Sequence, residues 1–309
     1  MISRCWPNLI IPGAGRSGKM ALCEYLNRHQ DVFLPNPIEP NFFSYYKVNI
    51  NYNSKDELFY NNIITNKEGY NSIFNNGINS NIRIDASGSY LLFSDKTINE
   101  ISTMIPDYKK IKIIIMLRNP IDRALSAFTH YTMHKFESLP MQKAINTTTI
   151  TERLNNHWSP NYDYISGSMY FYNVKNYLKN FNDVKIVLST DLKNNTVNTL
   201  KSIYEFLELP CEIPINIQSN INTSGIVKSQ ILNDILFDGS NIFRRIAQPI
   251  VKQFINVDKR TELKNKLRSK NLREPQKITY ELRKNLVSNF KKDIKELEGI
   301  IQRDLSHWL

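Results

Sequence analysis

The stretch LIIPGAGRSGKMALCEYL, residues 9–26, carries residue types that bind phosphate groups. Gly13, Gly15 and Gly18 spell G-x-G-x-x-G, which is typical of dinucleotide-binding loops. With Lys19 the segment also spells G-x-x-x-x-G-K, the P-loop of nucleoside triphosphate enzymes without its final Ser or Thr. The two patterns share one prediction, a tight loop that holds an anion.

The elements around this loop must place the anion at the start of a helix. Residues 8–12 form a short apolar run of strand character, and residues 19–29 have the apolar spacing of a helix. A helix N-terminus offers free backbone N–H groups and the positive end of the helix dipole, so an anion binds there. Glycines needed only for the shape of a turn would not explain Arg16 and Lys19. We therefore expect a ligand that carries phosphate.

A second group of charged residues follows the apolar strand at residues 111–117. Arg118 ends this strand, and Arg123 and Ser126 lie on the helix that comes next. Ligands of open α/β sheets bind at the carboxyl ends of the strands, so we expect Arg118 to bind an anion that Arg123 and Ser126 help to hold. A nucleoside triphosphate enzyme would place a magnesium-binding Asp there and Ser or Thr at position 20, where this chain has Met20. Both differences count against ATP-dependent phosphoryl transfer.

The dinucleotide pattern lacks its second part. It requires a carboxylate about 20 residues after the loop, at the end of the next strand. The candidate, Glu39, lies in the proline-broken segment LPNPIEPNFFS, which does not continue as a central strand. Nothing in this pattern explains the charged residues between Arg118 and Ser126.

With these residues together, the chain resembles the sulfotransferases that use 3′-phosphoadenosine 5′-phosphosulfate (PAPS), in particular bacterial members and the heparan sulfate branch. The specific match is R-N-P-x-x-R-A-x-S at residues 118–126, the 3′-phosphate motif of the family, which is present at every fixed position. R-S-G-K at residues 16–19 is similar to the family's 5′-phosphosulfate loop. The resemblance implies a single α/β domain with a central parallel sheet flanked by helices, built like a P-loop nucleotide kinase but needing no metal.

Further matches extend the resemblance over most of the chain. They are I-E-P-N-F-F at residues 38–43, D-A-S-G-S-Y at 85–90, G-S-M-Y at 167–170 and D-L-S-H-W at 304–308. Residues 138–160 and 218–271 match weakly. The departures from the family pattern are Lys19 for Thr, Ile38 and Ala86 for Lys, and Asp191 for Glu.

The resemblance also implies which residues bind the donor. Arg16 and, secondarily, Lys19 would stabilise the transferred sulfuryl group, because cations can supply the stabilisation that kinases take from magnesium. Arg118 and Ser126 would bind the 3′-phosphate through charge-assisted hydrogen bonds. The expected donor-binding set is Arg16, Ser17, Gly18, Lys19, Met20, Arg118 and Ser126.

Three side chains are candidates for the base that must take a proton from the acceptor. Glu39 matches the glutamate of the E-x-x-F-F element that the heparan sulfate branch uses. His130 is the rival, because it lies four residues after Ser126 and so on the same helical face. Asp85 is a third candidate, whereas we expect tyrosines such as Tyr90 to pack in the core.

Strand-like and helical segments alternate along the chain, which argues for βαβ units around a parallel sheet. Strands are expected at residues 9–12, 81–84, 112–117 and 184–189, and helices at 19–29, 120–134, 162–180, 196–207 and 278–303. Residues 138–160 are predicted to be a surface excursion of the kind that forms substrate loops or lids. We expect one sulfotransferase-like domain over residues 1–309, with a basic helical part at about 226–309.

Composition limits the class of protein further. The chain has 309 residues, of which 41% are hydrophobic, and its three cysteines are too few and too scattered for a disulfide framework or a zinc site. No run approaches the roughly 18 apolar residues of a membrane span, and the N-terminus lacks the apolar core of a signal peptide. We therefore expect a cytoplasmic protein with no membrane span and no metal.

The net charge of +11 lies in the C-terminal third, where residues 240–295 hold 16 Lys or Arg against 5 Asp or Glu. Such a segment implies an anionic partner. The resemblance implies transfer of a sulfuryl group from PAPS to a hydroxyl or amine, with a carbohydrate favoured as acceptor and no nucleic acid expected. A P-loop kinase, or a catalytically silent nucleotide-binding protein, are the alternatives.

Overall fold

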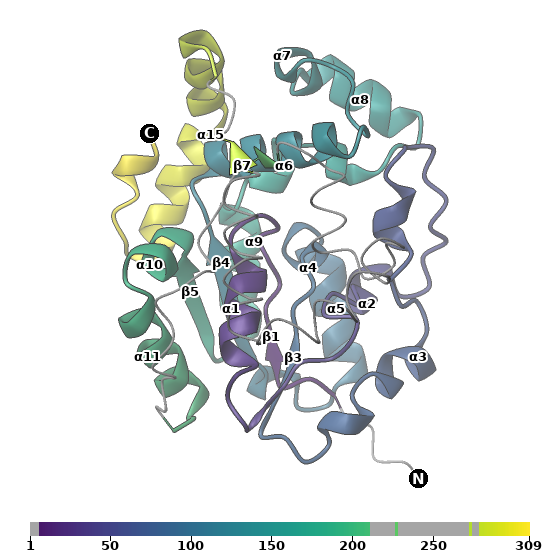
Figure 1. Ribbon diagram of the computed structural model, residues 1–309, viewed down its shortest axis with the longest axis vertical. Helices are drawn as coiled ribbons and strands as arrows, with labels where there is room; N and C mark the ends of the chain where they lie inside the picture. Colours follow the sequence, from purple (N-terminus) through teal and green to yellow (C-terminus); the bar gives the residue numbers. More distant parts are fainter. Residues whose placement is uncertain (1–5, 211–225, 228–271, 274–277) are drawn as a thin grey trace, which may run out of the picture.

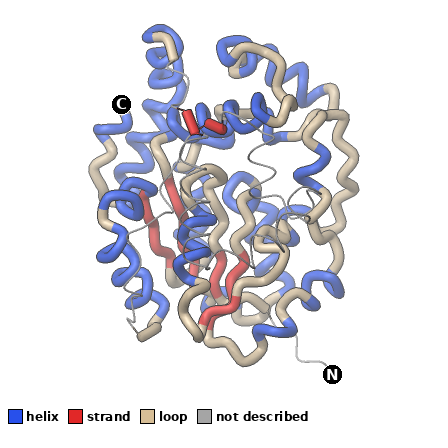
Figure 2. The backbone as a smooth tube through the Cα atoms, in the orientation of Figure 1, coloured by secondary structure: helices blue, strands red, loops and turns tan. Residues whose placement is uncertain are grey.

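The computed structural model describes residues 6–210, 226–227, 272–273 and 278–309. They form a single α/β domain around a central sheet of five parallel strands in the order β2-β3-β1-β4-β5 (Figures 1 and 2). The strands are β1 (Leu9–Ile10), β2 (Val32–Phe33), β3 (Ile82–Asp85), β4 (Lys112–Leu117) and β5 (Val184–Leu188). This architecture confirms the predicted fold class.

Helices cover both faces of the sheet (Figure 1). Those in the described residues are α1 (Lys19–Leu26), α2 (Phe42–Tyr45), α3 (Lys67–Ser72), α4 (Ser89–Leu92), α5 (Ser94–Met104), α6 (Pro120–Met133), α7 (Met141–Ala144), α8 (Thr147–Asn155), α9 (Phe171–Asn180), α10 (Ser189–Asn194), α11 (Thr196–Leu207) and α15 (Tyr280–Ile301). Two short strands, β6 (Ile226–Val227) and β7 (Leu272–Arg273), pair antiparallel.

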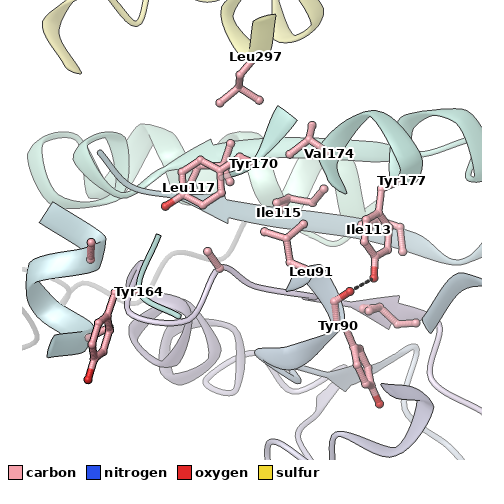
Figure 3. Close-up of a cluster of buried hydrophobic side chains, with 14 of the residues drawn as sticks. Tyr90, Leu91, Ile113, Ile115, Leu117, Tyr164, Tyr170, Val174, Tyr177 and Leu297 are labelled. Atoms are coloured by element: carbon pink, nitrogen blue, oxygen red, sulfur yellow. Dashed lines mark hydrogen bonds between the residues drawn. The ribbon is translucent and has the colours of Figure 1, made fainter. Parts of the chain in front are cut away.

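The residues of β4 alternate between the two halves of the core. Ile113, Ile115 and Leu117 pack with α5, α6, α9 and α15, whereas Ile114 and Met116 pack with α1 and α11. This division follows from the two-residue period of a strand, and a strand buried on both faces is apolar throughout. Figure 3 shows the half of the core that contains Ile113, Ile115 and Leu117. There the Tyr177 hydroxyl of α9 donates to the backbone carbonyl of Tyr90 at 3.0 Å.

The predicted elements agree with the structure except where local signals are weak. Four strands and the helices over 120–134, 196–207 and 278–303 were expected within a few residues of their observed bounds. The edge strand β2 was missed, because two residues are too few to show alternation. The single helix expected over 162–180 is two short 3-10 turns, Pro160–Tyr162 and Ser166–Ser168, followed by α9.

The expected surface excursion at 138–160 is helical and fixed to the core, since it contains α7 and α8. Glu137 and Arg153 form a bidentate ion pair with two N–O distances of 2.8 Å, and both side chains are buried. Glu137 also accepts from the Tyr164 hydroxyl at 3.0 Å, and the Arg153 guanidinium lies over the Trp158 ring at 4.9 Å. These contacts anchor the segment as a wall at the surface. The expected surface excursion is therefore present, but it is helical where a loop was expected.

The C-terminal helix α15 packs against the sheet side that carries α9 and caps that helix. The Asp293 carboxylate accepts from the backbone N–H groups of Tyr170 at 2.8 Å and Phe171 at 3.0 Å. An acidic side chain at a helix N-terminus satisfies free N–H groups and interacts favourably with the dipole. The terminal residues therefore help to place the segment that leads into α9.

Most of the basic segment at 240–295, and with it much of the expected C-terminal part at 226–309, lies outside the described residues. The same holds for Cys5 and Cys211. Among the helices that are described, none combines the length and the apolar character needed to cross a membrane.

Candidate functional site

The glycine-rich loop between β1 and α1 is fastened to the end of β4. The Ala14 N–H donates to the Met116 carbonyl at 2.6 Å, and the Met116 N–H donates to the Gly13 carbonyl at 2.8 Å. A side chain at Gly13 would meet Leu91 at 3.0 Å, and Gly18 has a φ of +90°, a conformation that glycine adopts without strain. The loop glycines therefore serve close packing and the turn into the helix.

The start of α1 is open to an anion. Gly18 is the N-cap and supplies no side-chain hydrogen bond, and the first turn contains no acidic residue. The first-turn N–H groups thus have no capping partner from a side chain in the described part of the chain, so the helix start suits a phosphate oxygen. Met20, the second residue of the helix, is 40% exposed. Its expected contribution to donor binding is through the backbone.

The structure brings the two sequence motifs together. The Arg16 Nε donates to the Ser126 Oγ of α6 at 3.3 Å, and the Arg118 guanidinium donates to the Arg16 carbonyl at 3.3 Å. The Arg123 guanidinium contacts the same loop, because its Nε donates to the Gly15 carbonyl at 3.2 Å. Residues separated by more than 100 positions therefore form one cationic site.

None of these three arginines has a carboxylate within ion-pair distance among the described residues. Burial is the main effect that lowers the pKa of Arg16, followed by the positive charges of Arg118 and Arg123, while Glu39 raises it. Like charges gathered without counter-charges repel one another. An anion bound at the loop would relieve the repulsion.

The loop also contains a buried hydroxyl, that of Ser17. Ser17 is 1% exposed, and its Oγ has no hydrogen-bond partner of good geometry in the part of the chain that is described. The nearby Tyr170 hydroxyl donates to the Arg118 carbonyl at 3.0 Å, and burial raises its pKa to about 12. A hydrogen bond between the Ser17 and Tyr170 hydroxyls opposes this rise, so Tyr170 is the neighbour of the Ser17 hydroxyl inside the loop.

Glu39 lies at the edge of this cationic site and pairs with Lys19. The Lys19 ammonium donates to the Glu39 carboxylate and to the Ala86 carbonyl. The Lys19 side chain is 3% exposed, whereas that of Glu39 is 42% exposed. Lys19 is therefore directed at Glu39 instead of at the open side of the loop.

His130 also lies close to Arg16 but in an aromatic environment. Its ring stacks on Phe59 at 5.3 Å between centroids and meets the His134 ring edge-on at 4.6 Å. Burial first, then the charges of Arg16 and His134, lower the pKa of His130 to about 3. At neutral pH it is an uncharged and very weak base.

Asp85, the third candidate for the base, is poorly placed for that role. Its carboxylate is fully buried and accepts from the hydroxyls of Ser87 at 2.6 Å, Tyr70 at 2.6 Å and Tyr90 at 2.8 Å. A carboxylate with three committed donors and no exposure holds the core together. The same hydrogen bonds explain why Tyr90 is a packing residue, as expected.

Arg123 has a role that the motif did not reveal. It was expected to help hold the anion, but its guanidinium donates to the Ser168 Oγ at 3.0 Å as well as to Gly15. A side chain at Gly167 would come within 2.6 Å of it, so glycine leaves the room it needs. Arg123 therefore ties the loop to the turn before α9. The G-S-M-Y element at 167–170 was the signal for this contact.

No group of three or more His, Cys, Asp or Glu side chains in the described residues is arranged to hold a metal ion.

Comparisons with known proteins bear on the family and the fold of the chain. A family model described as a sulfotransferase domain matches residues 7–298. A solved sulfotransferase from Alicyclobacillus acidocaldarius is 23% identical and aligns with a TM-score of 0.71 over 98% of this chain and 99% of its own, which shows the fold. The sulfotransferase domain from the curacin biosynthetic pathway is 15% identical, with a TM-score of 0.46 over 94% of this chain and 99% of that one. A search of curated proteins found no match.

Proposed function

The chain belongs to the sulfotransferase domain family, and from that premise we propose that it transfers a sulfuryl group from PAPS to a hydroxyl or amine of an acceptor. Membership of the family implies a transferase. The donor, the acceptor and the residue roles are our proposal. The observation that carries it is the convergence of Arg16, Arg118 and Ser126 on a glycine-rich loop, with no carboxylate paired to either arginine among the described residues.

The residues present fit the donor. Its 5′-phosphate suits the open start of α1, with the backbone N–H groups of Gly18 and Met20 and the Ser17 hydroxyl as donors. Its 3′-phosphate suits Arg118 and Ser126, which offer a planar guanidinium and a hydroxyl. The donor supplies an activated sulfuryl group whose leaving group is a phosphate.

We assign to Arg16 the stabilisation of the negative charge that develops on the leaving group during transfer. The acceptor oxygen or nitrogen attacks sulfur, the bond from sulfur to the phosphate oxygen breaks, and adenosine 3′,5′-bisphosphate leaves with that electron pair. Negative charge thus grows on the leaving phosphate, beside the guanidinium. Preorganised cations at the place where charge develops give a large share of catalysis. This role needs no magnesium, in agreement with Met20 and Arg118 at the two metal-linked positions.

Glu39 is our choice for the base that takes the acceptor's proton. Of the carboxylates in the described residues, it is the one that lies close enough to raise the pKa of Arg16, and its side chain is 42% exposed. Its rival, His130, also lies near Arg16, but its pKa of about 3 makes it a poor proton acceptor at neutral pH. The carbohydrate acceptor is supported by the family resemblance and by the basic C-terminal third.

Ligand-dependent melting separates the proposal from its main alternative. Adenosine 3′,5′-bisphosphate at a hundredfold excess over its Kd should stabilise the protein by about 2.7 kcal/mol without magnesium. A kinase would instead be stabilised by ATP together with magnesium. A silent binding protein would respond to the bisphosphate but transfer no labelled sulfate from PAPS to heparosan, 4-nitrophenol or dodecanol.

The base is tested by exchanging one group at a time. Glu39→Gln keeps the shape and removes the basicity, so transfer should fall about 10²-fold or more while bisphosphate binding persists. The matched variant His130→Asn should cost much less. The reverse order of the two rates would assign the proton to His130 and overturn the role of Glu39.

A further inference from the structure

Lys19 is a buried cation that contacts the segments following β2 and β3. Its ammonium donates to the Glu39 carboxylate and to the backbone carbonyl of Ala86, and its side chain is 3% exposed. Burial of a charge is costly unless the group is paired and hydrogen-bonded, and Lys19 meets both conditions here. To reach a phosphate in the loop, the ammonium would have to leave both partners.

The geometry leaves one oxygen of Glu39 uncommitted to Lys19. The ion pair uses Oε1, while Oε2 faces Gly88 at the start of α4. A Cβ placed on Gly88 would lie 3.7 Å from Oε2, 3.7 Å from the Lys19 Cε and 3.9 Å from the Gly15 Cα. The backbone of Gly88, with φ of −70°, would accept any residue. Its lack of a side chain therefore leaves space between Oε2 and the loop.

Resting on the proposed function, we propose that Lys19 is a positioning residue for the acceptor base and not a ligand of the donor phosphate. It holds Oε1 of Glu39, so that Oε2 faces the space beside Gly88, where the acceptor's hydroxyl or amine gives up its proton. The ammonium spans from the first residue of α1 to the loop that carries Glu39. This contact keeps the distance between the loop that binds the donor and the Glu39 carboxylate constant.

A double-mutant cycle tests this role. Lys19→Met removes the charge at similar length, Lys19→Arg keeps it, and Glu39→Gln removes the base. Adenosine 3′,5′-bisphosphate affinity is measured by calorimetry, and transfer from labelled PAPS is measured with the three acceptors above and with water, which gives free sulfate. Melting temperatures identify variants that fail to fold.

If Lys19 positions Glu39, Lys19→Met should change the bisphosphate Kd less than about threefold while transfer falls about tenfold or more. In the background of Glu39→Gln it should cost less than about threefold, because residues that act as a unit are not additive. Lys19→Arg should recover more of the rate than Met. If Lys19→Met does not fold, the Arg variant and its combination with Glu39→Gln carry the same comparison.

Two results would overturn the inference alone. One is a loss of bisphosphate affinity of tenfold or more in Lys19→Met, as expected for a phosphate ligand. The other is an equal loss of rate with and without Glu39. The proposed function fails in a different way: the parent protein would not bind the bisphosphate, or Glu39→Gln would keep the parental rate.

Discussion

The molecule uses arginine in opposite ways in two regions. In the wall formed by α7 and α8, Arg153 is buried, paired in bidentate fashion with Glu137 and covered by Trp158. Around the loop before α1, Arg16 and Arg118 meet each other instead of a carboxylate. The first arrangement satisfies every charge and builds structure. The second leaves charge unsatisfied and prepares the site for an anion.

The same comparison separates the arginine expected to govern stability from the arginines expected to govern ligand binding. A buried pair that loses one partner leaves an uncompensated charge, so it is expected to govern stability. A partly exposed arginine without a partner contributes little to the fold and much to binding. Two substitutions test this contrast, and a third tests the histidine that lies near Arg16; they are given from the largest expected effect to the smallest.

Arg153→Met should destabilise the protein by about 3 to 5 kcal/mol, because the Glu137 carboxylate would stay buried without its cation. Urea unfolding followed by circular dichroism measures the change. The double variant Arg153→Met with Glu137→Met should recover most of the loss, since apolar residues of similar volume often replace a buried pair without cost. A loss below about 1 kcal/mol in the single variant would contradict the structural role of this pair.

Arg118→Ala should leave the free energy of unfolding within about 1 kcal/mol of the parent but weaken adenosine 3′,5′-bisphosphate by roughly 2 to 5 kcal/mol. The physical reason is the lost charge-assisted hydrogen bonding to the 3′-phosphate. Calorimetry with the bisphosphate, and with adenosine 5′-monophosphate as the matched ligand that lacks this group, locates the effect. Equal losses for both nucleotides, or no loss, would remove the 3′-phosphate assignment.

His130 should make the fold sensitive to acid. Its pKa is about 3 in the folded protein against an ordinary value of 6.5, so the unfolded chain binds the extra proton between these values. Its stabilising contribution is therefore present above pH 6.5 and is lost as pH falls towards 3, by at most about 1.4 kcal/mol per pH unit. Urea unfolding at pH 7 and pH 5 should show a smaller difference in His130→Asn. An unchanged difference would mean that other groups carry the acid sensitivity.

Much of the fold was predictable because its signals are local. The apolar run of β4 and the apolar spacing of α1, α6, α11 and α15 follow directly from burial on one or both faces. The edge strand β2 was missed because two residues are too few to show alternation. The breaks at residues 160–168 were missed because they depend on where neighbouring segments pack. The helices α7 and α8 were missed for the same reason, as their anchor is a pair 16 residues apart.

The candidate site divides in the same way. By itself the sequence determined the family motifs, the loop before α1 and the strand end that carries Arg118, since these are patterns within about ten residues. Only the tertiary structure decided that Lys19 binds Glu39 across 20 residues and that Arg16 meets Ser126 across 110. It also showed that the Asp85 carboxylate accepts hydrogen bonds from three hydroxyl groups in the core, which argues against a role as the base. The physical reason is that a motif records which groups are present, whereas their charge partners and their exposure to water depend on segments that meet only in the folded chain.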